Sequence, residues 1–292
     1  MNQSWGWNFG GETVFAGGNV NGGGQLKNYW YVSGGIGWEG KNLSTSALRG
    51  GPAMKFPSRL NQWYDISTDG RKPVQFGIGG FNTWLGDGDS RFNEFYFSLL
   101  FRPYNAMSIS MNPFINFNKD NLQYVGTIGS ANGERYLFGR IDQKTLGITF
   151  RINYSVTPDL SIQYYGQPFV SAGEYTEFKR VTSPRADRYA DRFQTFTNEI
   201  TQDRGTFLVD EDLDGATDYS FGKPDFNFRQ FRSNLVVRWE YNPGSTVFLV
   251  WSQSRTGFQD NGEFSFRSDL RGLFDVYPDN VFLIKLSRWF SL

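Results

Sequence analysis

Hydrophobic and polar residues alternate along most of this chain with a period of two. The last stretch, residues 281–292, shows the pattern clearly, because its apolar side chains fall on one parity: Phe282, Ile284, Leu286, Phe290 and Leu292. The other parity includes the polar residues Lys285 and Ser287. Alternation with this period predicts a β-strand, and a continuous apolar face opposite a polar one is typical of a strand between lipid and a wet interior. The stretch therefore predicts the closing strand of a transmembrane β-barrel.

The same alternation recurs often enough to predict about fourteen strands. Pro113 lies within one of them and predicts a β-bulge, because proline cannot donate to the ladder. The glycine-rich run 17–24 breaks the pattern and predicts a loop. The predicted strands are residues 5–9, 29–39, 44–49, 62–68, 74–78, 94–102, 107–117, 122–128, 134–141, 145–155, 160–164, 231–241, 247–254 and 281–292.

The connections between these strands predict a single all-β domain over residues 1–292, an antiparallel up-and-down barrel. Two long polar segments, residues 172–223 and 256–279, predict extracellular loops that contain short helices. Short connections are expected together at the periplasmic end, as in bacterial outer-membrane barrels with an even strand number. They lie at residues 40–42, 69–72, 103–106, 130–133, 157–159 and 242–244.

A soluble β-sandwich or propeller would show the same alternation, with its apolar face inside. Tryptophans near strand ends favour the membrane alternative, because such rings form belts at membrane interfaces. They are Trp7, Trp38, Trp239 and Trp289. The one-sided loop lengths favour it as well.

Composition limits the possible functions. The chain has 29 basic and 29 acidic residues, and this balance gives no reason to expect a nucleic-acid partner. It has no His and no Cys, so hydrolysis by a Ser-His-Asp triad, a cysteine nucleophile and Cys/His zinc sites are excluded. No apolar run is long enough for a transmembrane helix. We therefore expect a non-enzymatic protein.

Several segments together resemble an uncharacterised Bacteroidota family of outer-membrane proteins. The segments are residues 48–52, 67–72, 226–231, 238–241, 243–245, 250–253 and 278–286. Members of that family look like barrels preceded by a domain similar to family 9 carbohydrate-binding modules. That N-terminal domain has no counterpart in this sequence, so the resemblance implies the barrel half of such a protein, located in the bacterial outer membrane.

Within the predicted barrel, strand parity directs a set of charged side chains to the lumen. They are Glu39, Asp65, Glu94, Arg102, Arg151, Arg238, Glu240 and Lys285. The two signs balance, so neither a strong anion filter nor a strong cation filter is predicted.

Alternating carboxylates in the first long loop suggest a calcium site. Asp210, Asp212 and Asp214 are followed by Gly215, a spacing that wraps oxygen ligands around a hard cation. Two further ligands are expected, the Ala216 carbonyl and the Asp218 carboxylate. Phe221 occupies the twelfth position, where a full EF-hand loop has a bidentate Glu. The alternative is an acidic, solvated loop.

The same loop contains a pattern that predicts a short amphipathic helix after Ser183 and Pro184. Its apolar face would consist of Ala186, Tyr189, Ala190 and Phe193. We expect this face to pack on the mouth or rim of the barrel. Leu270, Leu273 and Phe274 predict a second short helix in the last loop.

Two functional hypotheses follow from the sequence. In the first, the chain is a channel or transport module for small hydrophilic solutes, gated or narrowed by its long loops. In the second, it is a non-conducting barrel that anchors or scaffolds a larger outer-membrane complex. Outer-membrane lipid and other outer-membrane proteins are the expected partners, and calcium is the only cofactor that the sequence suggests.

Overall fold

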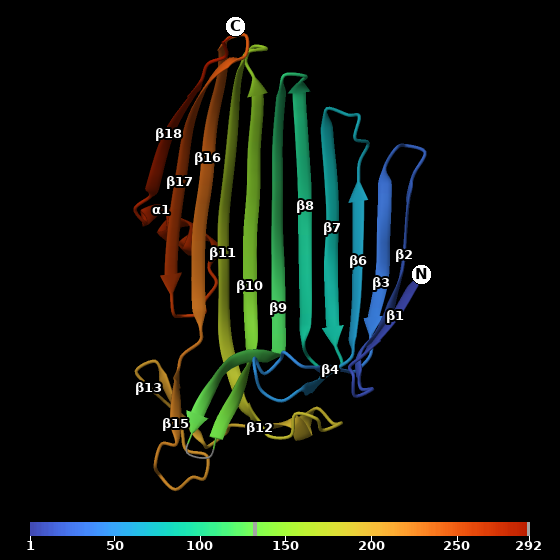
Figure 1. The fold of residues 1–292 in the computed structure, drawn as a ribbon, viewed down its shortest axis with the longest axis vertical. Coiled ribbons are helices and arrows are strands. Elements are labelled where there is room, and N and C mark those ends of the chain that lie inside the picture. The colour runs from blue at the N-terminus through green and yellow to red at the C-terminus, as the bar shows by residue number, and fades with distance from the viewer. Residues whose placement is uncertain (131–132, 291–292) are drawn as a thin grey trace.

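One large antiparallel sheet dominates the computed structural model, which describes residues 1–130 and 133–290 (Figure 1). Over these residues, twelve strands pair in sequence order, and the short β12 (Phe193–Thr195) pairs with β11 beside this path. The all-β, antiparallel prediction is therefore confirmed. The twelve strands are β1 (Asn2–Trp7), β2 (Thr13–Gln25), β3 (Tyr31–Glu39), β6 (Arg59–Ser67), β7 (Val74–Leu85), β8 (Arg91–Tyr104), β9 (Met107–Ser130), β10 (Gly133–Ser155), β11 (Leu160–Val181), β16 (Phe226–Asn242), β17 (Ser245–Gln259) and β18 (Asp279–Ser287).

The two ends of the sheet carry connections of different length. The upper end in Figure 1, called the turn end here, has short connections at residues 26–30, 68–73, 105–106, 156–159 and 243–244. The lower end, the loop end, carries the long connections 40–58, 182–225 and 260–278. Two connections were predicted for the turn end, around residues 40–42 and 130–133. The strands that precede them, β3 and β9, end at the loop end instead. The placement of these connections was wrong because it followed a miscounted strand order.

The strand count differs from the prediction for three physical reasons. The glycine-rich run 17–24 is part of β2, because its missing side chains let the Trp38 ring of β3 lie over Gly18. Residues 44–49 form mostly turn, and Arg49 adopts φ 47°. Four predicted strands are two long ones, β9 and β10, since polar residues between them continue the ladder. No register shift occurs at Pro113, so the predicted bulge was wrong; only its pairing with β8 is interrupted.

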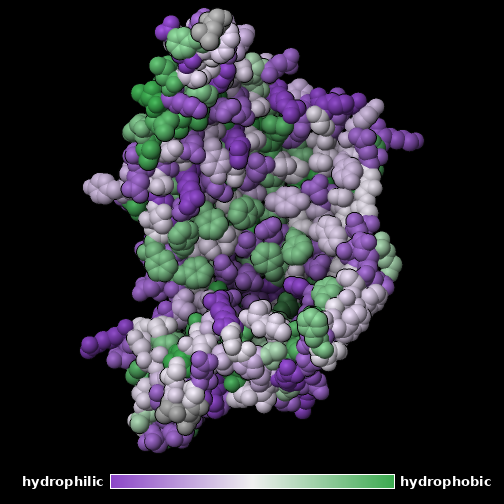
Figure 2. All heavy atoms as spheres, viewed as in Figure 1, coloured by the Kyte–Doolittle hydropathy of each residue, from purple (hydrophilic) through white to green (hydrophobic). Residues whose placement is uncertain are grey.

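Both edges of the sheet are open. Among the described residues, β1 pairs only with β2 and β18 only with β17, so a closed barrel is not shown. The closing strand ends at Ser287, and Phe290 lies beyond it. Leu292 lies outside the described residues. Hydrophobic side chains gather along the β18 edge, at the upper left of Figure 2.

Opposite faces of the sheet differ in chemistry. The pairing register aligns Ile66, Ile78 and Phe97 on adjacent strands of one face, the apolar face. Ile78 is 50% exposed and Ile284 is 75% exposed, so this face is largely uncovered. Residues of the other parity form the polar face. On β10, the apolar positions run from Leu146 to Tyr154, which is about 26 Å along a strand.

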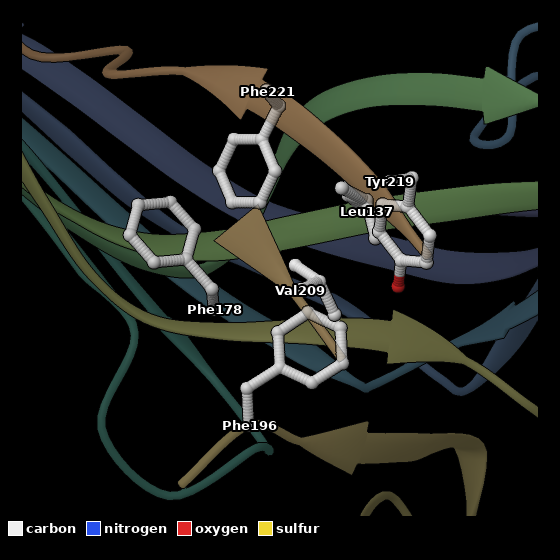
Figure 3. Close-up of a cluster of buried hydrophobic side chains, with 6 residues drawn as sticks. All are labelled: Leu137, Phe178, Phe196, Val209, Tyr219 and Phe221. Carbon is white, nitrogen blue, oxygen red and sulfur yellow. The ribbon is translucent and has the colours of Figure 1, made fainter. Parts of the chain in front are cut away.

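Beyond this apolar band, β9, β10 and β11 continue toward the loop end and carry two hydrophobic clusters. The first joins Leu137 and Phe178 to a small sheet of β13 (Ile200–Asp203), β14 (Thr206–Val209) and β15 (Tyr219–Gly222) (Figure 3). The second cluster packs Leu48 and Met54 on Leu122 and Phe138. Leu48 lies between β4 (Asn42–Ser44) and β5 (Met54–Phe56), and Met54 begins β5. The two clusters shield the long strands from solvent and thereby hold the loops of the loop end against them.

The helices agree with the prediction only in part. A helix is present in the last loop, α1 (Phe266–Asp275), with Leu273 buried. The helix predicted after Ser183 is a single 3-10 turn, η1 (Ala190–Arg192), because Phe193 already pairs with Val181 in the β11–β12 ladder. Among the described residues, no helix is both long and apolar enough to cross a membrane.

Candidate functional site

The polar face is the first part of the candidate site. The pairing register places seven of the eight charged residues predicted for the lumen on this face, and alternation from Phe101 places Arg102 there too. The eight are spread from β3 to β18. Most interact locally: the Tyr96 hydroxyl donates to Asp65 at 3.0 Å, and Arg238 pairs with Glu240 at 2.7 Å. They therefore line a surface and do not form one catalytic cluster.

Large aromatic side chains on the polar face lie flat against neighbouring strands. The Tyr96 ring covers Gly79, the Trp63 ring covers Gly35, and in both places an added Cβ would overlap the ring. Glycine opposite an aromatic residue lets the ring rest on the backbone. The rings therefore lie close to the backbone of the sheet and do not project far from the polar face.

A cavity of about 390 Å³ lies where the polar face meets the loop end. Glu39 and Arg59, which form an ion pair, line it together with Lys119, Asp120 and the ring of Phe81. This volume and the mixture of apolar and polar groups are typical of pockets for small molecules. Sequence reasoning missed Lys119 and Asp120, because they stand in a polar stretch that resembles a loop.

Asp120, which lines this cavity, and the buried Lys179 lie in the extension of the long strands. Burial raises the pKa of Asp120 although the Leu122 backbone N–H donates to its carboxylate at 2.7 Å. Burial lowers the pKa of Lys179, whose ammonium lies 3.4 Å from the Tyr189 hydroxyl. Desolvation thus weakens the charged form of both groups.

Residues 182–192 and 40–58 form a second part of the site, called the floor here. The guanidinium of Arg192 is buried and donates to the carbonyls of Ala186, Asp187 and Lys55. Arg185 pairs with Glu12 of the β1–β2 turn at 2.5 Å, and Lys55 pairs with Asp187 at 2.6 Å. The loop after β11 is thereby tied to the strands at the other edge of the sheet.

The residues predicted for the loop helix contribute to this floor without forming a helix. The Tyr189 and Phe193 rings lie 5.3 Å apart and pack on the cluster of Leu48, Met54, Leu122 and Phe138. Ala186 offers its carbonyl to Arg192, and Ala190 begins η1.

The acidic loop between β14 and β15 is the third part. Carboxylate oxygens of Asp210, Asp212 and Asp218 lie within 4.8 Å of one another. Two ligands of one Ca²⁺ ion, each at 2.3–2.6 Å, are at most about 5 Å apart, so these oxygens fit one hard cation. Asp214 is outside this group and accepts from the Ala216 backbone N–H at 2.8 Å. Of the five predicted ligands, the structure brings three together.

Sequence reasoning missed the residue that anchors the acidic loop. Glu211 is buried between Arg135 and Arg180, at 3.0 and 3.3 Å, and accepts from the Tyr219 hydroxyl at 2.7 Å. Burial alone would raise its pKa, but these donors lower it, whereas burial raises the pKa of Tyr219. Alternation could have identified it: Glu211 stands between Asp210 and Asp212, so its side chain points to the opposite side, toward the protein.

Residues 14–290 match a family model described as a domain of unknown function, DUF5916. The chain belongs to this family. No curated protein and no solved structure matches it. The predicted membership of an uncharacterised family agrees with this match, while its outer-membrane location and carbohydrate-binding companion domain have no support from it.

Proposed function

We propose that the chain is the β-barrel module of a bacterial outer-membrane protein and passes small hydrophilic solutes. The observation that carries the proposal is the uncovered apolar band on one face of a long antiparallel meander. On β10 the band covers nine residues, from Leu146 to Tyr154, which is the length with which a tilted strand crosses a bilayer core. Long loops gather at one end and short turns at the other, as in such barrels.

Closure of the barrel would pair the free edges of β1 and β18. The chain has no native cysteine, so disulfide trapping tests this pairing without background. Ser4 and Leu283 are on the polar-face parity of their strands, and Trp5 is on the opposite parity. In membranes, we expect Ser4→Cys to cross-link with Cys at 281, 283 or 285, whereas Trp5→Cys with the same partners should not. No cross-link in any same-parity pair would overturn closure.

Conduction depends on the polar face and on the floor. The flat aromatic rings and the balanced charges favour a lumen without strong ion selectivity. The floor crosses its loop end through the pairs Arg185–Glu12 and Lys55–Asp187. We therefore expect small, infrequent conductance steps from the purified chain in planar bilayers, with little difference between K⁺ and Cl⁻.

Removing the floor pairs should raise the open probability. Both pairs are exposed and screened by solvent, so Arg185→Ala with Lys55→Ala should increase it only modestly. Arg188→Ala is the matched control, because Arg188 is exposed and contacts only nearby Asp191, at 3.8 Å. Electrical silence of the unmodified chain and of both variants would refute the channel.

One observation favours the second candidate, a non-conducting barrel that anchors a larger complex. Buried Arg192 and the cluster around Met54 hold the floor with interactions that solvent does not weaken. Under this alternative, silence would persist while closure cross-links still form. Calcium at Asp210, Asp212 and Asp218 would rigidify the outermost loop under either function.

A further inference from the structure

Helix α1 packs on the apolar face of the sheet. Its Phe274 ring lies 5.5 Å from the Phe231 ring of β16. Arg255 of β17, which is paired with Phe231 in the ladder, donates to the carbonyls of Phe274 and Val276 at 2.6 and 2.8 Å. The helix therefore occupies the outside of the proposed barrel.

Buried polar contacts fix the orientation of α1. The Asn227 amide donates to the Asp269 carboxylate at 2.9 Å and to the Glu263 carbonyl at 2.6 Å. A Cβ at Gly272 would lie 2.5 Å from the Arg229 guanidinium, so glycine permits this close approach. Because one side of the helix is held in this way, its opposite side must face outward.

The ladder places α1 at the lower margin of the apolar band. Arg229, beneath the helix, pairs with Val170, which pairs with Leu146, the last apolar band position of β10. Figure 1 shows α1 beside the lower end of β18. The helix thus lies at the level where the band ends and the polar extension begins.

The outward side of α1 carries two arginines, and two exposed aromatic rings lie at and just beyond its C-terminal end. Phe274 is 52% exposed and Tyr277 is 95% exposed. Arg267 and Arg271 are exposed at i, i+4 spacing, and neither pairs with another side chain among the described residues. Aromatic rings beside basic residues on an amphipathic helix are typical of the lipid headgroup layer.

We propose that α1 is an interfacial helix that rests in the outer leaflet and binds phosphate groups of anionic lipid through Arg267 and Arg271. This inference rests on the membrane barrel proposed above. The positive charge of the outward arginines is complementary to lipid phosphate. Continuity with the apolar band places the Phe274 and Tyr277 rings at the acyl boundary.

The test uses the full chain reconstituted in phosphatidylcholine vesicles with or without phosphatidylglycerol. A Tyr277→Cys variant carries an environment-sensitive fluorophore, and the lipids carry nitroxide quenchers at the headgroup or deep in the acyl region. Native tryptophans of the band are read in the same vesicles. We expect headgroup quenching of the label, about twofold stronger with phosphatidylglycerol. An Asp203→Cys label on the protruding sheet should not be quenched.

Substitution of both arginines, Arg267→Gln with Arg271→Gln, should abolish the dependence on phosphatidylglycerol. Arg188→Gln is the control and should retain it. Quenched tryptophans with an unquenched label at position 277 would overturn the helix assignment alone. Quenching that ignores phosphatidylglycerol would overturn phosphate binding. Unquenched tryptophans would instead refute the membrane barrel itself.

Discussion

Glu211→Gln should release the small sheet of β13, β14 and β15 from the long strands. The carboxylate side chain is 10% exposed, and its partners Arg135 and Arg180 are 14% and 23% exposed. Glutamine has nearly the same shape and keeps an acceptor for the Tyr219 hydroxyl. The variant therefore removes the negative charge that faces the partly buried guanidinium groups of Arg135 and Arg180.

The expected magnitude follows from this burial. Removing one partner of a fully buried ion pair costs about 3–5 kcal/mol. Partial exposure of the arginines and the retained hydrogen bond reduce this to about 2 kcal/mol. Since each 1.4 kcal/mol is a factor of ten, local opening of the small sheet should become about thirtyfold more frequent.

Amide hydrogen exchange of residues 200–222 measures this opening directly. Asp203→Asn is the matched control, because its carboxylate lies in the same small sheet but is 71% exposed. We expect faster exchange in Glu211→Gln and no change in the control. Equal protection of these residues in both variants would refute a stabilising role for Glu211.

The same carboxylate predicts a pH dependence. Its pKa is lower in the folded protein than the ordinary value of 4.5, because the arginines and Tyr219 outweigh the effect of burial. Its stabilisation is thus complete above about pH 4.5 and is lost as the pH falls through the folded-state pKa. Exchange of the small sheet, corrected for intrinsic rates, should accelerate in acid in the unmodified chain and much less in Glu211→Gln.

Three further variants test other parts of the molecule. Asp212→Asn with Asp218→Asn should abolish calcium-dependent protease protection of the acidic loop; equal digestion of the unmodified chain with calcium or chelator would contradict the site. Phe138→Ala should destabilise the loop end by about 3–5 kcal/mol, measured by hydrogen exchange of residues 40–58. Gly79→Ala should cost about 1–3 kcal/mol in urea unfolding, because its Cβ would displace the Tyr96 ring; an unchanged midpoint would contradict the flat-ring packing.

Period-two alternation predicted the two faces of the sheet well, because side-chain direction in a strand is a local property. Strand boundaries were less predictable, since pairing partners decide them. Polar residues around 118–121 look like a loop, yet Asn118 faces Gln143 across the β9–β10 ladder and donates to it at 3.3 Å. No local pattern distinguishes such a polar ladder from a turn.

The candidate site was less predictable than the fold. The aspartate spacing brought three carboxylates together, because their loop is short and closed by one β-hairpin. In contrast, the face of Tyr189 and Phe193 was attributed to a helix, although extended backbone in β12 presents Phe193 to the same cluster. Arg192 received no role, since the contact that joins it to the other floor segment is with the Lys55 carbonyl, far away in sequence.

The floor can open in only one direction if the band lies in a membrane. Residues 40–58 are anchored on β9 and β10 by Leu48 and Met54, which are 1% and 0% exposed, and exposing them would cost several kcal/mol. The Arg185–Glu12 pair is largely exposed, so solvent screens it and it holds the floor far less strongly. The floor should therefore separate first at the β1–β2 turn while it stays attached to the long strands. A cross-link between Cys residues at positions 12 and 185 should abolish conductance, and a reductant should restore it; unchanged conductance in the cross-linked protein would place the opening elsewhere.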